Sequence, residues 1–196
     1  MTTTRNTKKH PTNSSTATAV RYALDRQLIL SLRELAAREL KPDDIASYLL
    51  FLLVLGTGLR TQEAIDLTWA EITDGCVWIK AKANNTSHLW DRKIPLKSEL
   101  LAILEAHRGQ STDWVIPGHS IGNPGQGQSK NSASVRLMTW LRSNMGTEFP
   151  GSPVYCLKKI SVIGMTKELG AGEAAKCLGH SSVATAKSSY GQPTKE

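Results

Sequence analysis

Arg60 is the first side chain whose setting suggests chemistry. It follows a run of apolar residues and two glycines, Gly56 and Gly58. A guanidinium at such a place can project from a rigid turn into a phosphate site and make bidentate hydrogen bonds to the anion. The competing interpretation is an exposed arginine at the start of a helix that pairs with Glu63, three residues later. Arg60 alone leaves both interpretations open.

Two short glycine-containing motifs suggest other enzymes, and their surroundings argue against both. Ser120 lies in a G-x-S-x-G pattern at residues 118–122, but the nucleophile elbow of a hydrolase needs a helix directly after it, and here Pro124 follows. Residues 170–175 resemble a dinucleotide-binding fingerprint, but a helical pattern precedes them instead of a strand. We therefore interpret residues 170–172 as the stop of one helix and the start of another, and keep a serine hydrolase as a remote alternative.

Arg60 belongs to a longer pattern, in which Gly58, Glu63, Trp69 and Ile72 stand at fixed intervals from it. This pattern resembles the first catalytic-arginine box of the tyrosine recombinase (phage integrase) family, G-x-R-x-x-E followed by apolar positions and W-x-x-I. The resemblance extends over about residues 22–191. It implies the catalytic-domain fold of these DNA breaking and rejoining enzymes, mainly α with a small antiparallel β-sheet.

Further boxes follow in the order that the family has. Residues 79–96 resemble the family's β-hairpin that carries a catalytic lysine, a place that Lys82 fits best and Lys80 second. Residues 177–182 resemble its L-G-H-S-S box, which supplies His180, and Tyr190 follows as the implied nucleophile. An arginine, a lysine, a histidine and a tyrosine in this order, with a strand pair between the first two, indicate membership far better than any one of them.

Two departures from the family pattern bear on activity. Where the family has H-x-L-R, this chain has Tyr155 in place of the histidine and Lys158 in place of the second phosphate-binding arginine. Lysine keeps the charge but is a point donor, which cannot bind a phosphate in two places. Losing one preorganised charge-stabilising donor typically costs about 10²–10³-fold in rate. The interval from His180 to Tyr190 is also one residue longer than usual in the family.

The resemblance implies DNA strand cleavage and rejoining without a metal or nucleotide cofactor. Tyr190 would attack a phosphodiester and form a 3′-phosphotyrosyl link, while Arg60, Lys158 and His180 stabilise the charge of the pentavalent phosphate. Lys82 would protonate the leaving oxygen. We therefore expect an enzyme of site-specific DNA recombination or integration, with catalysis impaired by the substituted box. A catalytically inactive recombinase-like protein that binds DNA as an accessory or regulator is the alternative.

The charge of the chain favours an anionic polymer as its partner. Lysine and arginine number 24 against 17 acidic residues, which gives a net charge of +7. Residues 1–41 and residues 130–196 each carry a net charge of +5, so the two ends are basic and the middle is nearly neutral. We expect double-stranded DNA to be bound through its phosphates, and a solvated basic surface is the alternative. The candidate DNA contacts are Arg5, Lys8, Lys9, Arg21, Arg26, Lys80, Arg136 and Lys159.

Helices must position most of these residues. Apolar spacing predicts helices over residues 22–40, from residue 45 to a stop at Gly56, from Thr61 onward, and near residues 100–104, 135–145, 157–169 and 174–178. Asp43 and Asp44 precede the second of these helices, as caps and first-turn acids do. Residues 76–79 and 93–95 are predicted to pair in a small hairpin or meander, and residues 114–116 to form a short strand.

The composition predicts one domain with a basic tail. Residues 1–20 hold almost no large apolar side chain, so we expect a disordered tail ahead of an integrase-like catalytic domain at residues 21–196. The longest apolar run, residues 48–55, is too short to span a membrane, and no secretory signal is present. The three cysteines indicate neither a disulfide framework nor a zinc site. We expect a cytoplasmic, nucleoid-associated protein of prokaryotic or phage context, working as a homo-oligomer on DNA or with a partner recombinase.

Overall fold

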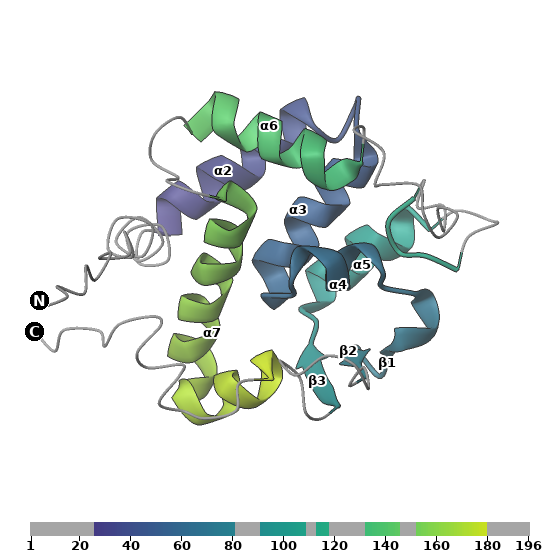
Figure 1. Ribbon diagram of the computed structural model, residues 1–196, viewed down its shortest axis with the longest axis vertical. Coiled ribbons are helices and arrows are strands. Elements are labelled where there is room, and N and C mark those ends of the chain that lie inside the picture. Colours follow the sequence, from purple (N-terminus) through teal and green to yellow (C-terminus); the bar gives the residue numbers. More distant parts are fainter. Residues whose placement is uncertain (1–25, 81–90, 109–112, 118–131, 146–151, 180–196) are drawn as a thin grey trace, which may run out of the picture.

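The computed structural model describes residues 26–80, 91–108, 113–117, 132–145 and 152–179 (Figure 1). The helices are α2 (Arg26–Glu39), α3 (Ile45–Thr57), α4 (Thr61–Ile65), α5 (Ser98–Ala106), α6 (Ala133–Met145) and α7 (Pro153–Leu178), with a 3-10 turn, η1, at Trp69–Glu71. Three short strands, β1 (Ile72–Thr73), β2 (Cys76–Ile79) and β3 (Arg92–Pro95), form an antiparallel sheet. The predicted class, mainly α with a small antiparallel sheet, is confirmed.

Helix α3 lies at the centre of the core. Residues 46–54 are all buried, so this helix presents apolar side chains on every side. Such a helix must be surrounded by others, and α3 contacts α2, α5, α6 and α7. Figure 1 shows it between α6 and α5, with α7 alongside. None of the helices in the described ranges is both long and apolar enough to cross a membrane.

The two ends of α3 are fixed by Asp44 and Gly58. The Asp44 carboxylate accepts a hydrogen bond from the Ser47 amide N–H at 3.1 Å, so this part of the predicted cap is confirmed. The predicted stop at Gly56 is wrong. Gly56 lies inside the helix, and Gly58 ends it with a left-handed backbone (φ 67°), from which its N–H reaches the Val54 carbonyl. Only the glycine that adopts a positive φ closes the last turn.

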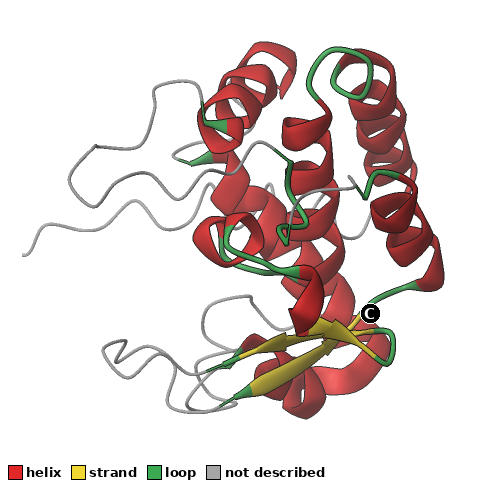
Figure 2. Cartoon of the chain, turned by 90° about the vertical axis from the view of Figure 1, so that its right-hand side faces the viewer, coloured by secondary structure: helices red, strands yellow, loops and turns green. Residues whose placement is uncertain are grey.

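The three strands form a meander in the order β1-β2-β3. Asp74 and Gly75, which join β1 to β2, both have positive φ, the backbone of a tight hairpin turn. Strand β1 is absent from the prediction because two residues cannot show an alternating pattern. Figure 2 shows the sheet at one end of the helices. Residues 114–116 do not form the predicted strand, since the strand pairing there is an isolated bridge between Trp114 and Thr68.

Helix α7 is a long element with one break. Ser152 caps its start by accepting a hydrogen bond from the Tyr155 N–H at 3.4 Å, and Pro153 takes the first turn, where no N–H is needed. Gly170 (φ 82°, ψ 158°) leaves the helical conformation, so the predicted stop and restart is confirmed. The helix begins at Pro153, before the predicted start at residue 157, and the substituted family box therefore lies in its first two turns.

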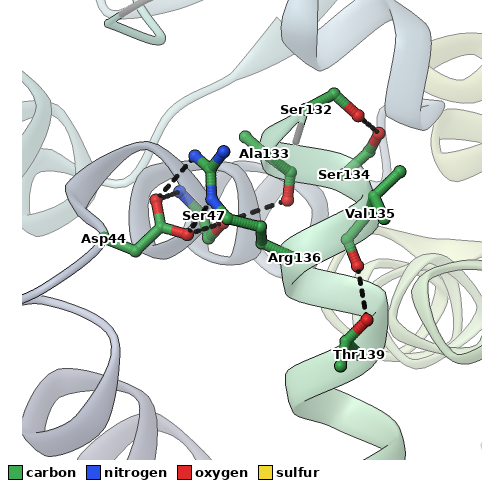
Figure 3. A network of polar contacts seen from close by, with 8 residues as sticks. All are labelled: Asp44, Ser47, Ser132, Ala133, Ser134, Val135, Arg136 and Thr139. Carbon is green, nitrogen blue, oxygen red and sulfur yellow. Dashed lines mark hydrogen bonds and ion pairs between the residues drawn. The ribbon is translucent and has the colours of Figure 1, made fainter. Parts of the chain in front are cut away.

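A polar network ties α6 to the start of α3 (Figure 3). The Arg136 guanidinium donates to both oxygens of Asp44, from Nε at 2.5 Å and from Nη2 at 3.0 Å. The Ser47 hydroxyl lies 3.0 Å from the Ala133 carbonyl oxygen. Burial alone would raise the pKa of Asp44, but the hydrogen bonds from Arg136 and Ser47 lower it below its ordinary value. One carboxylate thus caps α3 and anchors α6.

Candidate active site

Arg60 is held at the turn between α3 and α4. Gly58 ends α3, Leu59 is fully buried, and Arg60 precedes α4 with an extended backbone (φ −65°, ψ 149°). A Cβ placed on Gly58 would lie 3.1 Å from Leu178 and 3.3 Å from Ser161, so the turn packs directly against α7. The Arg60 amide N–H donates to the Glu63 carboxylate at 2.8 Å, which caps α4. The backbone of Arg60 is therefore fixed on both sides.

The Glu63 carboxylate joins two arginines. It lies 3.2 Å from Nη1 of Arg60 and 2.7 Å from Nη2 of Arg92 on β3. The side chain of Arg92 is 3% exposed and that of Arg60 is 38% exposed, so Arg60 alone of the pair reaches the surface. Burial would raise the pKa of Glu63, but the hydrogen bond and charge of Arg92, together with Arg60, lower it. Glu63 is therefore ionised at neutral pH.

Lys158 lies on α7 close to this cluster. It is 7% exposed. Burial is the main cause that lowers the pKa of its ammonium from the ordinary 10.5 to about 8; the charge of Arg60 lowers it further, Glu63 opposes this, and Arg92 adds to it. Unlike the arginine of the family box, this lysine can lose its proton close to physiological pH.

Arg60, Tyr155 and Lys158 line one pocket of about 170 Å³, together with Thr61 and Val154. Arg60 comes from the start of α4, whereas Tyr155 and Lys158 stand three residues apart on α7 and therefore share a face of that helix. Two cationic side chains and a tyrosine around a small pocket suit a phosphate group. Within the described ranges, no three His, Cys, Asp or Glu side chains cluster as they would around a metal ion.

The two interpretations of Arg60 prove compatible. Its guanidinium pairs with Glu63 and also lines the pocket, because the pair restrains the side chain without covering it. The structure thus brings together three of the predicted catalytic residues, Arg60, Tyr155 and Lys158.

Lys159, a predicted DNA contact, is buried beside Tyr155. It is 7% exposed, and its ammonium lies 5.2 Å from the centroid of the Tyr155 ring. Residues 156–163 of α7 are all buried, so Lys159 has buried neighbours on both sides along the helix. Tyr155, which directly precedes these residues, is 50% exposed, and the Lys159 ammonium lies against its ring.

Two further predicted residues that the structure describes, Lys80 and Arg136, lie outside this pocket. Lys80 is exposed and lines a separate pocket of about 530 Å³ beside Trp78 and Asp91. Arg136 is bound by Asp44, as described above. Arg26 is the first residue of α2. The predicted tail of residues 1–20, which includes Arg5, Lys8 and Lys9, lies outside the described residues. So do Arg21, Lys82, Ser120, His180 and Tyr190.

Arg92 is the site residue that the sequence analysis missed. The signal was the alternation of β3, in which Arg92 and Ile94 are buried while Lys93 and Pro95 are exposed. An arginine at an inward position needs a buried anionic partner. Four residues are too few for the pattern to show which of two adjacent basic side chains points inward.

These features define a helical domain with a cationic pocket suited to a phosphate. A model of the phage integrase family matches residues 23–196, and the chain therefore belongs to that family. A search among curated proteins gave no significant match.

Solved structures with a similar fold include a lambda integrase dimer bound to a COC′ core site. It shares 20% identity with this chain, the match covers 87% of this chain and 48% of that one, and the TM-score is 0.61. A Tn1549 transposon integrase in complex with a circular intermediate DNA shares 14% identity over 97% of this chain and 65% of its own, with a TM-score of 0.61. The XerA recombinase shares 18% identity over 96% of this chain and 63% of its own, with a TM-score of 0.55. This chain thus spans about half to two thirds of the length of these relatives.

Proposed function

We propose that this chain is a tyrosine recombinase that binds double-stranded DNA and cleaves and rejoins its strands through a 3′-phosphotyrosine at Tyr190. The observation that carries the proposal is the pocket in which Arg60 and Lys158 meet. Two cationic side chains from separate elements converge there, as the binding of a phosphodiester and the stabilisation of its growing charge require. In this proposal residues 21–196 form the catalytic domain.

Family membership and the similar structures support duplex DNA as the substrate. The lambda integrase structure is a dimer bound to a core site, and the Tn1549 integrase structure contains a circular intermediate DNA. We therefore propose that this chain works as a homo-oligomer on DNA or with a partner recombinase, in DNA integration or a related rearrangement. The basic ends of the chain, each with a net charge of +5, would bind phosphates on either side of the cleavage site.

Each residue has one task in the proposed reaction. The Tyr190 hydroxyl attacks phosphorus and loses its proton to solvent, the bond from phosphorus to the 5′ oxygen breaks, and Lys82 donates a proton to that oxygen. Arg60, Lys158 and His180 bind the oxygens on which negative charge grows. Rejoining is the same step in reverse, with a 5′ hydroxyl attacking the phosphotyrosine. Tyr155 lines the pocket where the family pattern has histidine, and its hydroxyl would donate a neutral hydrogen bond to the phosphate.

A set of nicked duplexes with randomised sequence tests the proposal. Cleavage near the nick releases a short fragment, so the protein stays covalently bound to DNA and migrates as a separate band on a denaturing gel. We expect this band with the unchanged protein and not with Tyr190→Phe, and peptide mapping should locate the DNA on Tyr190. An adduct that survives Tyr190→Phe would refute the assignment of the nucleophile.

A catalytically inactive DNA-binding regulator is the second candidate, and Lys158 is the observation that favours it. The buried ammonium binds a phosphate at one point only, and its pKa of about 8 leaves part of the molecules uncharged above neutral pH. A regulator of this kind would retard duplex DNA on a native gel and form no adduct. It would also stay inactive after Lys158→Arg, whereas a weakened recombinase should gain cleavage.

A further inference from the structure

Arg92 is nearly fully buried yet lies outside the pocket. Its side chain is 3% exposed, and its one described ion pair, between Nη2 and Glu63, measures 2.7 Å. Nε and Nη1 have no hydrogen-bond partner within the part of the chain that the structure describes. A buried guanidinium is costly unless it is paired, so this arginine depends on Glu63.

Glu63 connects Arg92 to the pocket. The same carboxylate accepts the Arg60 backbone N–H at 2.8 Å and lies 3.2 Å from Nη1 of the Arg60 guanidinium. The Arg60 N–H and the Arg92 guanidinium both contact Oε2, so groups from two separate elements restrain the carboxylate that holds the Arg60 head group. Arg92 contacts one of its oxygens, Oε2, and leaves Oε1 to Arg60. The orientation of Glu63 is therefore restrained from the sheet side as well as from the Arg60 backbone.

The ion pair also joins two elements that are distant in sequence. Arg92 pairs with Ile79 across β2 and β3, and Lys80 follows Ile79 directly. A fixed distance between Glu63 and Arg92 thus fixes the end of the β2–β3 hairpin relative to the Arg60 turn.

We propose that Arg92 is a positioning residue, which orients Arg60 through the shared Glu63 carboxylate and holds the β2–β3 hairpin against the Arg60 turn. The inference rests on the proposed function, because it presumes that Arg60 binds the reacting phosphate. A displacement of about 1 Å at a charge-stabilising group can cost about 10²-fold in rate. Arg92 would therefore affect cleavage although it does not touch DNA.

The first experiment compares Arg92→Gln with Arg92→Lys and with a stability-matched control. The control is Ile94→Val or Ile94→Ala, whichever melts closer to Arg92→Gln; Ile94 is 1% exposed, lies two residues further along β3 and leaves the ion pair intact. We measure adduct formation with saturating DNA at a temperature where every variant is folded, and DNA affinity separately. We expect Arg92→Gln to lose about 10- to 100-fold in the rate constant with about threefold or less in affinity, and Arg92→Lys to lose less. The Ile94 variant should stay close to the unchanged protein.

The results separate positioning from folding. Equal losses in Arg92→Gln and in the Ile94 control would show a structural role only and overturn the inference, as would an unchanged rate in Arg92→Gln. If Arg92→Gln does not fold, Arg92→Lys takes its place in the comparison. A greater loss of rate in Arg92→Lys than in the Ile94 control then supports positioning, and an equal loss overturns it.

A second measurement decides the inference even if the unchanged protein forms no adduct, in which case the proposed cleavage fails by itself. The Nε–H signal of Arg60 in the ¹⁵N spectrum is identified by its absence from Arg60→Lys. We expect Arg92→Gln to shift or broaden that signal in the free protein, and the Ile94 control to leave it in place. An Arg60 signal that is the same in Arg92→Gln as in the unchanged protein would overturn the positioning role.

Discussion

Lys158 should make cleavage sensitive to pH in a range where an arginine would not. With a pKa of about 8, the ammonium carries its charge in about nine tenths of the molecules at pH 7 and in about one tenth at pH 9. If only the charged form stabilises the phosphate, the contribution of Lys158 to the cleavage rate falls about tenfold over these two pH units. The cause is burial first, with the Arg60 charge adding to it.

Comparison with Lys158→Arg isolates this effect. Arginine stays protonated throughout, and the two proteins share the pH dependence of every other group. The ratio of the adduct-formation rate of the variant to that of the unchanged protein should therefore rise about tenfold from pH 7 to pH 9. The assay uses DNA below saturation, because the rate then reports the free protein, before a bound phosphate raises the pKa of Lys158. At pH 7 we expect Lys158→Arg to raise cleavage more than affinity, since the arginine acts on charge that develops in the transition state.

A constant ratio between pH 7 and pH 9 would refute this reasoning. An NMR titration of the Lys158 side chain then shows which step is at fault. If Lys158 titrates near pH 8 and the ratio is constant, the lysine does not act on the reacting phosphate. If it titrates near 10.5, its ordinary value, the burial of the ammonium in the folded protein is less than the structure indicates.

Three further predictions concern stability and binding. Between pH 8 and 10.5 the unfolded chain holds a proton on Lys158 that the folded protein has lost. The free energy of unfolding should therefore rise with pH in this range, by about 3 kcal/mol in all. Urea unfolding at pH 7 and pH 10 should show this rise in the unchanged protein and not in Lys158→Met. Gly58→Ala should lose about 1–2 kcal/mol of stability from its left-handed backbone (φ 67°), and more from crowding against Leu178. Gly75→Ala has the same φ and open space around it, so in thermal melts it should lose only the backbone part. Affinity for duplex DNA should fall with salt at a log–log slope of about −0.9 per phosphate bound, and a slope near zero in fluorescence anisotropy between 50 and 200 mM salt would contradict phosphate binding.

The sequence was informative where a local pattern determines the structure. The box around Arg60 combines a helix end, a glycine with positive φ and a capping glutamate, all within eight residues, and the structure has each of them. Asp44 and the break at Gly170 were predictable for the same reason, since a cap and a helix break depend on the residues beside them.

Burial by distant elements was not predictable. Lys158 and Lys159 are adjacent on α7 and look alike in the sequence, yet one lines the pocket and the other lies against the Tyr155 ring. Arg92 and Lys93 are likewise adjacent, and only the packing of β3 against the helices decides which is buried. A helix or strand fixes the angle between neighbouring side chains, whereas the tertiary fold decides which of them faces the core.

The charge balance of the cluster gives a physical reason for a lysine at position 158. Three cationic side chains, Arg60, Arg92 and Lys158, share one described carboxylate, Glu63, which is paired with both arginines. A third permanent charge at a place that is 7% exposed would add repulsion whenever the pocket is empty. A lysine with a pKa of about 8 relieves part of that repulsion by losing its proton, and a phosphate in the pocket favours taking the proton back. In the proposed function, the substitution thus replaces a charge that is always present with one that the bound phosphate stabilises, at the cost of the second hydrogen bond that an arginine would make.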